Sequence, residues 1–443
     1  MKKKLDEVLV MQRTPIETHR KTVDITILLF KLSGFWDYDS SKFPLKLVNF
    51  LSRTVNWACC LCILLSLAVD IIKNIENLEV ISNDVGYLAP IYSIFFKSIK
   101  VQTLQKEIRE LINSIHQPID KLRYSSDVGV LTKIRTAISY QNFDYSVYAS
   151  ILSFVFCAVI IIFSSISDTG LPMRGYFPFN ETISPAFQIV FFIQFWTILM
   201  NCVWVLLADL LLIGLIRWIN VQLYILQNNY ENCRLDISDR DNFSISQDNY
   251  TLIKNYNFFK VPEEQFRIRS FVAFQMDEIN VKNDSFALRF KTCIKHHQRI
   301  IDSVNDYNNL FNSMLFVQIF NNQSVACLFL FQGVLAMKQN KEFINYFMCS
   351  ASSVTELFYF CFFGSQLIIE AEKVHESQWK SGWNDNICPE VRDLMLNAQL
   401  QSMKPLKIIA GYFFVFSVET FVLVLQKAYS YFAILNTVID EKV

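Results

Sequence analysis

Seven apolar segments recur along the chain, separated by stretches rich in charged and amide side chains. They cover residues 55–73, 86–99, 145–166, 186–216, 309–337, 345–371 and 406–438. A helix needs roughly 20 mainly apolar residues to cross about 30 Å of hydrocarbon. The second segment is the weakest candidate, because Pro90 and Lys97 interrupt it. The pattern predicts an all-α, polytopic membrane protein with seven transmembrane helices.

The segments between these helices predict how the chain is organised. We expect a cytoplasmic N-terminal segment at 1–54, transmembrane helices 1–4 within 55–227, a cytoplasmic loop and amphipathic helix at 228–308, transmembrane helices 5 and 6 within 309–371, a cytoplasmic anchor helix within 372–405, and helix 7 with the tail at 406–443. The apolar pattern from Pro185 to Ile225 extends for about 60 Å at about 1.5 Å per residue. Helices 4 and 5 should therefore project into the cytoplasm.

Residues 286–308 predict an amphipathic helix that leads into the fifth span. Its apolar positions recur at helical spacing, with charges between them: Phe286, Phe290, Ile294, Ile300, Ile301 and Val304. The pair His296-His297 lies in this helix, but adjacent helical residues do not face one ligand, and no Cys or carboxylate follows four residues later. We expect no metal site here and no cofactor.

The positions of Lys and Arg predict the orientation in the membrane. Of 41 such residues, 35 lie in or beside the segments before helix 1 and after helices 2, 4 and 6. Because cytoplasmic loops hold the excess of basic residues, the N-terminus should be inside and the C-terminus outside. G-protein-coupled receptors have the opposite orientation, and the chain lacks their Asp-Arg-Tyr and Asn-Pro-x-x-Tyr motifs.

A glycosylation triplet agrees with this orientation. Asn180-Glu181-Thr182 falls in the loop expected outside, after helix 3, which makes Asn180 the candidate acceptor. Asn242, Asn249 and Asn283 also begin such triplets, but they fall in a loop expected inside. The N-terminal residues lack the apolar stretch of a signal peptide, so no removable one is expected.

Composition disfavours a soluble enzyme or a nucleic-acid-binding protein. The chain is 52% hydrophobic and 19% charged, with 41 acidic and 41 basic residues, so no net charge favours nucleic acid. No phosphate-binding loop, nucleophile elbow or metalloprotease motif is present. Three carboxylates lie inside spans, Asp209, Glu356 and Glu419, and such groups face a bundle interior or water. A transporter with an inside N-terminus stays open as an alternative.

The C-terminal third carries a set of motifs at defined spacing. They are Cys361 to Gly364 as Cys-x-x-Gly, Trp383, Lys404-Pro405, Ala410-Gly411, Thr420-Phe421, and Ala428 to Phe432 as Ala-Tyr-Ser-Tyr-Phe. Over about 75 residues the chain resembles the insect odorant receptors. The family usually has Tyr four positions before the Trp, where this chain has Trp379. Gustatory receptors end helix 7 differently, and a gustatory-type channel of the same superfamily is the second alternative.

The resemblance implies a ligand-gated, non-selective cation channel of four subunits in the plasma membrane of sensory neurons. An odour-tuned subunit, which this chain resembles, assembles with co-receptor subunits into a heterotetramer surrounded by lipid. Trp379 and Trp383 would lie at the cytoplasmic anchor where subunits meet. Matching the end of helix 7 assigns the pore to Ile434, Thr437 and Val438, which also share one helical face.

A pocket for a small volatile organic molecule needs apolar, aromatic walls and few polar groups. The outer halves of helices 2, 3, 4 and 6 offer such side chains: Tyr92, Phe95, Leu152, Phe156, Phe195, Trp196 and Met200 for the walls, with Ser353 and Glu356 as polar groups. We expect the ligand to bind among them.

Overall fold

The computed structural model describes residues 20–37, 43–122, 127–161, 171–181, 183–234, 251, 260, 262, 267–272, 285–341 and 343–440. These residues are almost entirely helical, as predicted. The α-helices are α2 (Lys21–Leu32), α3 (Phe43–Lys73), α4 (Leu78–Thr103), α5 (Gln105–Leu122), α6 (Val128–Ile161), α8 (Ala186–Glu231), α10 (Phe286–Lys338), α11 (Ile344–Trp379), α12 (Pro389–Ser402) and α13 (Val418–Asp440). Short 3-10 turns η1 (Asn232–Arg234) and η7 (Trp383–Asn386) and strands β1 (Ile409–Ala410) and β2 (Phe414–Val415) complete the described elements.

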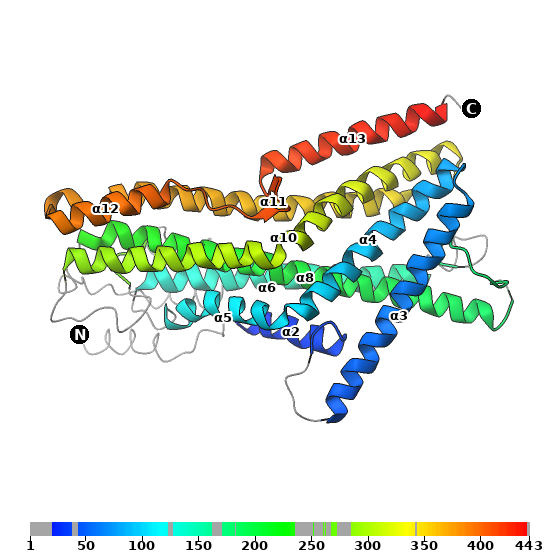
Figure 1. The fold of residues 1–443 in the computed structure, drawn as a ribbon, viewed down its shortest axis with the longest axis horizontal. Coiled ribbons are helices and arrows are strands. Elements are labelled where there is room, and N and C mark those ends of the chain that lie inside the picture. Colours follow the sequence, from blue (N-terminus) through cyan, green and yellow to red (C-terminus); the bar gives the residue numbers. More distant parts are fainter. Residues whose placement is uncertain are drawn as a thin grey trace.

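The helices form an elongated bundle (Figure 1). At one end, α12 lies beside the end of α11; at the other, a short connection joins α3 to α4. These are called here the α12 end and the α3–α4 end. Under the predicted orientation the α12 end is the inner one. Helix α13 lies on the outside of the bundle, where it contacts α10 and α11.

Helices α8 and α10 are the two longest of the described helices. Helix α8 has 46 residues and α10 has 53, which is about 70 and 80 Å at about 1.5 Å per residue. Ser285 caps α10 by accepting the Leu288 amide proton at 3.3 Å, so this helix begins at the predicted amphipathic segment. Both helices exceed what a bilayer requires, as the sequence predicted.

Five of the described helices are long and apolar enough to cross a membrane: Lys46–Lys73, Ala186–Arg234, Phe286–Lys338, Ile344–Trp379 and Val418–Thr437. The other two predicted spans lie in α4 and overlap α6, with 162–166 outside the described residues. Helix α4 continues through Pro90 without interruption and extends beyond 86–99 at both ends. Its buried Asp84 and Lys97 make it less apolar than a lipid-facing helix, because these side chains point into the protein.

The seventh predicted span, 406–438, starts too early. Residues before Val418 form the antiparallel pair β1–β2, with Ile409 opposite Val415 and Ala410 opposite Phe414. Gly411 turns the chain at φ +64°, a conformation that favours glycine. This pair satisfies backbone groups that a helix would otherwise have bonded, and α13 begins only afterwards.

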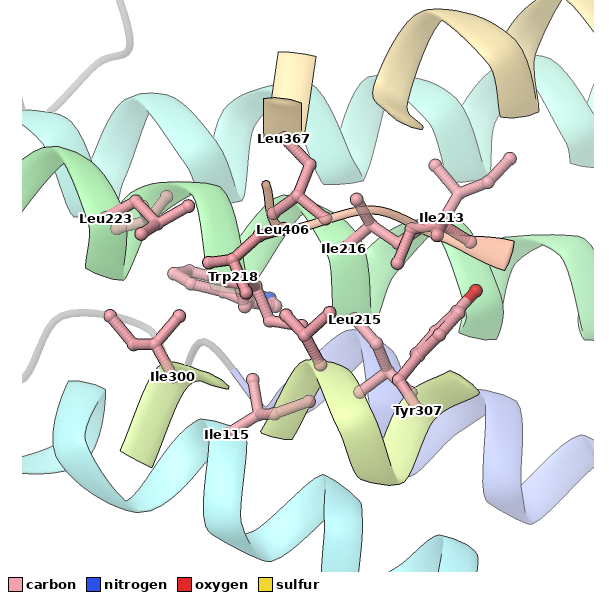
Figure 2. Close-up of a cluster of buried hydrophobic side chains, with 14 of the residues drawn as sticks. Ile115, Ile213, Leu215, Ile216, Trp218, Leu223, Ile300, Tyr307, Leu367 and Leu406 are labelled. Atoms are coloured by element: carbon pink, nitrogen blue, oxygen red, sulfur yellow. The ribbon is translucent and has the colours of Figure 1, made fainter. Parts of the chain in front are cut away.

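The main core lies toward the α12 end. Figure 2 shows Ile115 of α5, Leu215 and Trp218 of α8, Tyr307 of α10 and Leu406 of the segment before β1 packed together. A second, smaller cluster near the α3–α4 end joins α3, α4 and α8 to the 171–181 segment.

Candidate functional site

A buried ion pair connects α4 and α8 inside the bundle. The Lys97 Nζ lies 3.6 Å from the Asp209 Oδ1, and their side chains are only 3% and 1% exposed. An isolated charge at this depth would be very costly, so each group requires the other. The sequence singled out Asp209, but it treated Lys97 only as an interruption of a span. Single charges of opposite sign on two apolar helices were the signal that could have paired them.

Glu356 of α11 belongs to the same polar cluster. It accepts a hydrogen bond from the Gln318 side chain of α10, and its carboxyl group interacts with that of Asp209. Gln318 also donates to the Asn322 Oδ1 at 3.2 Å. The cluster therefore links α4, α8, α10 and α11. Four helices held through one set of charges can transmit a shift of one helix to the others.

Two of the predicted aromatic residues meet α3, a helix that the sequence prediction left out. The Trp196 Nε1 donates to the Asn56 Oδ1 at 2.7 Å. The Phe95 ring lies edge-on to the Trp57 ring, with centroids 6.0 Å apart. The neighbours Asn56 and Trp57, a polar and an aromatic residue within an apolar run, were the available signal. Helices α3, α4 and α8 thus form an aromatic region with few polar groups.

The other predicted ligand residues are distributed around this region. Phe195 stacks on Phe191 with ring centroids 6.4 Å apart, and Met200 is half-buried. Ser353 is buried and donates to the Ser350 carbonyl at 2.8 Å, while Tyr92 is exposed. The side chains of Leu152 and Phe156 lie outside the described residues. No hydrogen bond or ring contact within the described part of the chain joins Tyr92 or Met200 to the others, so their ligand role stays a prediction.

The predicted pore positions lie on an exposed face of α13. Ile434 is 55% exposed, and Thr437 is exposed with its Oγ1 donating to the Ile434 carbonyl at 2.8 Å. The Val438 side chain lies outside the described residues. Glu419, expected inside the bundle, is exposed instead, because α13 starts at Val418 and places this carboxylate in the first turn, where the helix dipole favours an anion.

The two predicted anchor tryptophans lie at the α12 end. Helix α11 ends at Trp379, and Gly382 turns the chain at φ +81° before Trp383, so the two residues lie on different elements, α11 and η7. Their rings still meet, with centroids 5.4 Å apart. Trp379 is exposed, whereas Trp383 packs against the main core. The exposed indole is available to a neighbouring subunit.

Asn180 is exposed in the described segment 171–181, which follows α6 and packs through other residues against α3 and α4. A glycosylation enzyme requires this exposure, and modification of Asn180 stays a prediction. In the described part of the chain, His, Cys, Asp and Glu side chains form no group of three or more able to hold a metal ion.

The structure explains why particular residue types are required at several positions of the C-terminal motifs. A Cβ atom added to Gly364 would lie 2.2 Å from the Phe416 carbonyl oxygen, so only glycine lets α11 pass this close to the segment before α13. Gly411 makes the β1–β2 turn, and Cys361 is fully buried between the same segments. These residues fix how α13 leaves the bundle.

Comparison with known proteins adds independent findings. Residues 70–429 match the family model described as 7tm Odorant receptor. The chain is 23% identical over 161 residues to the putative odorant receptor 92a of Drosophila melanogaster, covering 36% of this chain and 37% of that protein. It is 26% identical over 164 residues to odorant receptor 94a of the same species, covering 36% and 42%. The matched stretches span less than half the length of these curated relatives.

The fold is similar to that of the olfactory receptor OR5 from Machilis hrabei. The structure of OR5 in complex with eugenol matches with a TM-score of 0.70 at 12% identity, over 95% of this chain and 98% of OR5. A second OR5 structure gives a TM-score of 0.66 at 14% identity. At such low identity the likeness establishes a shared fold. Because the family model covers most of the sequence, this chain belongs to the odorant receptor family, as a multi-pass protein of the plasma membrane.

Proposed function

We propose that this chain is the odour-tuned subunit of a ligand-gated, non-selective cation channel. It assembles with co-receptor subunits, binds small volatile organic molecules between its transmembrane helices, and contributes α13 to a shared central pore. The proposal rests mainly on the exposure of α13. Only 11% of its most apolar window is buried, against 56% for α8 and α10. An apolar helix this exposed is covered by lipid or by other subunits, and we assign part of its exposed face to contacts with other subunits.

The exposed face of α13 supports a role at the pore. It presents an apolar side chain, Ile434, one turn from a hydroxyl, Thr437. A hydrophobic constriction gates a pore by excluding water, and nearby polar groups help ions through once it is wet. Membership in the odorant receptor family agrees with this use of the last helix.

The aromatic region between α3, α4 and α8 supports ligand binding. Trp196 and Phe95 supply apolar surface, and the Lys97–Asp209–Glu356 cluster lies among the helices that also surround this region. OR5 of Machilis hrabei is described in complex with eugenol, a small aromatic molecule. A ligand opens the channel only by binding the open state more tightly than the closed one. If the ligand contacts a helix that shifts relative to its neighbours when the channel opens, the ligand binds the two states with different affinities.

Replacement of Trp196 by Ala tests the ligand site. The change removes the ring and the hydrogen bond to Asn56, and it should shift the odorant concentration for half-maximal current by about tenfold, the equivalent of about 1.4 kcal/mol. Ion permeability should not change. Ile189→Ala is the matched control. Ile189 is exposed and lies about 10 Å from Trp196 along the same helix, at about 1.5 Å per residue, so its replacement should leave the response unaltered. An unchanged response of Trp196→Ala in complexes at the cell surface would remove this residue from the site.

The orientation has a separate test. An epitope tag at residue 2 should be reached by antibody only after permeabilisation, and Asn180→Gln should remove any glycan-dependent gel shift. Labelling of the N-terminal tag on intact cells would reverse the orientation and place α12 outside.

A further inference from the structure

A cleft between α6, α8 and α11 lies apart from the aromatic region and from α13. Its volume is about 700 Å³. Basic, aromatic and amide side chains line it, among them Lys133, Phe143, Arg217, Asn220, Tyr359 and Phe362. None of these residues belongs to the predicted ligand or pore positions, so the cleft requires its own explanation.

The floor of the cleft holds a buried arginine with donor capacity left over. Arg217 donates through its Nη2 to Asp144, and its guanidinium lies over the Phe363 ring at 5.0 Å from the centroid. The Tyr359 hydroxyl donates to the other Asp144 oxygen at 3.1 Å. The Arg217 side chain is about nine-tenths buried, yet its Nη1 has no hydrogen-bond partner in the described part of the chain. A buried, unsatisfied donor on a cation is costly, and an anion in the cleft would satisfy it.

A second cation lines the same cleft. The Lys133 Nζ lies over the Tyr224 ring, 3.9 Å from the centroid, and no carboxylate among the described residues forms an ion pair with it. Glu370, which also lines the cleft and attracts the Lys133 ammonium electrostatically, pairs with Lys373 at 2.9 Å and accepts a hydrogen bond from Gln227 at 2.9 Å. Asp144 is likewise occupied by Arg217 and Tyr359. A molecule bound in the cleft would therefore meet two cationic groups, whereas both carboxylates already have hydrogen-bond partners.

The wall of the cleft that faces outward is aromatic and exposed. Tyr140 is 56% exposed and Phe143 is 63% exposed, both on α6, and Phe362 of α11 is also exposed. Aromatic side chains at this exposure are typical of the boundary between hydrocarbon and headgroups. Asp144 and Arg217 stand next to the ends of the predicted spans 145–166 and 186–216. Under the predicted orientation, this boundary is the inner one.

We propose that this cleft is a binding site for an anionic phospholipid of the inner leaflet. The phosphate lies against the Arg217 Nη1 and the Lys133 ammonium, and an acyl chain covers Phe143 and Phe362. Asn220, whose Oδ1 is buried without a partner among the described residues, accepts a hydrogen bond from the headgroup. Basic pockets between transmembrane helices on the cytoplasmic side bind such headgroups. The occupied site would join α6, α8 and α11 through one lipid.

Native mass spectrometry of the full-length chain in detergent tests this directly. The probes are phosphatidylserine and phosphatidylcholine with identical acyl chains, added in equal amounts. The chain should retain phosphatidylserine at least about tenfold more strongly, since two basic groups act on one phosphate and carboxylate. Equal retention of the two lipids would contradict the proposal, and this comparison needs no variant to fold.

Variants of Lys133 identify the site. Lys133→Gln should lower the preference for phosphatidylserine about fivefold, while Lys133→Arg should keep it. Lys106→Gln removes the same charge from an exposed position on α5 and should have no effect. Equal losses from Lys133→Gln and Lys106→Gln would place the lipid elsewhere.

Two further outcomes would also overturn the proposal. Displacement of the lipid by an equal concentration of inorganic phosphate would reveal a site for a soluble anion. Loss of phosphatidylserine when the chain is purified with a co-receptor subunit would show that a subunit covers this cleft. The proposal uses the predicted orientation but not the channel activity, and binding is measured without current. Its failure would leave the proposed function standing.

Discussion

Helices α8 and α13 are both strongly apolar, yet α8 is largely buried and α13 is largely exposed. From Leu207 to Ile219 every residue of α8 is buried, and Figure 2 shows Leu215 and Trp218 enclosed by α5, α10 and α11. Along the described side chains of α13, only Val424 and Ala428 are buried. Apolar composition therefore does not tell how a helix is covered. The chain covers α8 by itself, whereas α13 depends on lipid or on other subunits.

The contrast extends to the way each helix is fixed. Helix α8 carries buried polar groups that need partners inside the bundle, such as Asp209 with Lys97. Helix α13 is held along one stripe, Val424 and Ala428 at i and i+4, and by the Val418 amide that donates to the Ser365 Oγ at 2.9 Å. Substitutions in the first region should act on stability, and those on the open face of α13 should act on conduction.

The largest effect should come from breaking the buried ion pair. Lys97→Met leaves Asp209 buried without its partner, which should cost about 3–5 kcal/mol. The thermal stability of the detergent-solubilised chain, followed by size-exclusion chromatography after heating, should fall sharply. Lys100→Met, at a half-buried position on the same helix where no carboxylate depends on the charge, is the matched control and should change little.

A double variant sharpens this result. Adding Asp209→Leu to Lys97→Met removes both charges and should recover much of the lost stability, because the unpaired charge rather than the lost attraction causes the damage. Equal stability of Lys97→Met and the unaltered chain would mean that the two charges do not depend on each other.

A middle-sized effect is expected where α11 passes the segment before α13. Gly364→Ala places a Cβ atom against the Phe416 carbonyl oxygen at 2.2 Å, and a backbone group cannot move aside easily. Overpacking of this kind costs about 1–3 kcal/mol. Gly333→Ala is the control, because its Cβ would meet only the Phe347 ring at 3.3 Å, which can rotate. Similar thermal stability of the two variants would show that this close approach is unimportant.

The smallest effect on stability should come from the open face of α13. Ile434→Ser should change stability by no more than about 0.5 kcal/mol, as surface substitutions do, while lowering the cost of wetting the constriction. Basal current or ion preference should change in recordings from complexes. Val424→Ser, on the buried stripe of the same helix, should instead lose about 1–3 kcal/mol. Unaltered basal current, permeability ratios and block in Ile434→Ser and Val438→Ser would remove both from the pore.

Periodicity and hydrophobicity predicted most of the fold. The amphipathic segment from Phe286, the length of α8 and a helix within 372–405 all follow from local spacing, and the structure has helices at these places. The start of α13 was missed because the backbone pairing of Ile408–Ala410 with Phe414–Phe416 depends on contacts that no single window of sequence contains. A short apolar run in the sequence does not distinguish a pair of strands from part of a helix.

The candidate site was predicted only in part, for a related reason. Residue type and helical spacing single out Trp196 and Glu356, but they do not tell which helices pack against them. The roles of Asn56 and Trp57 on α3, and of Lys97 as the partner of Asp209, appear only once the helices are placed side by side. Partners distant in sequence are set by tertiary packing.

Whole-cell recording shows whether this chain forms an odour-gated cation channel with a co-receptor, as we propose. The chain and a co-receptor subunit are expressed together, with surface expression confirmed, and an extensive panel of volatile compounds is applied. We expect odour-evoked, non-selective cation currents that differ in ligand preference from those of the co-receptor alone. An absence of evoked current at normal surface expression, or small currents coupled to uptake of a substrate as in a transporter, would contradict it.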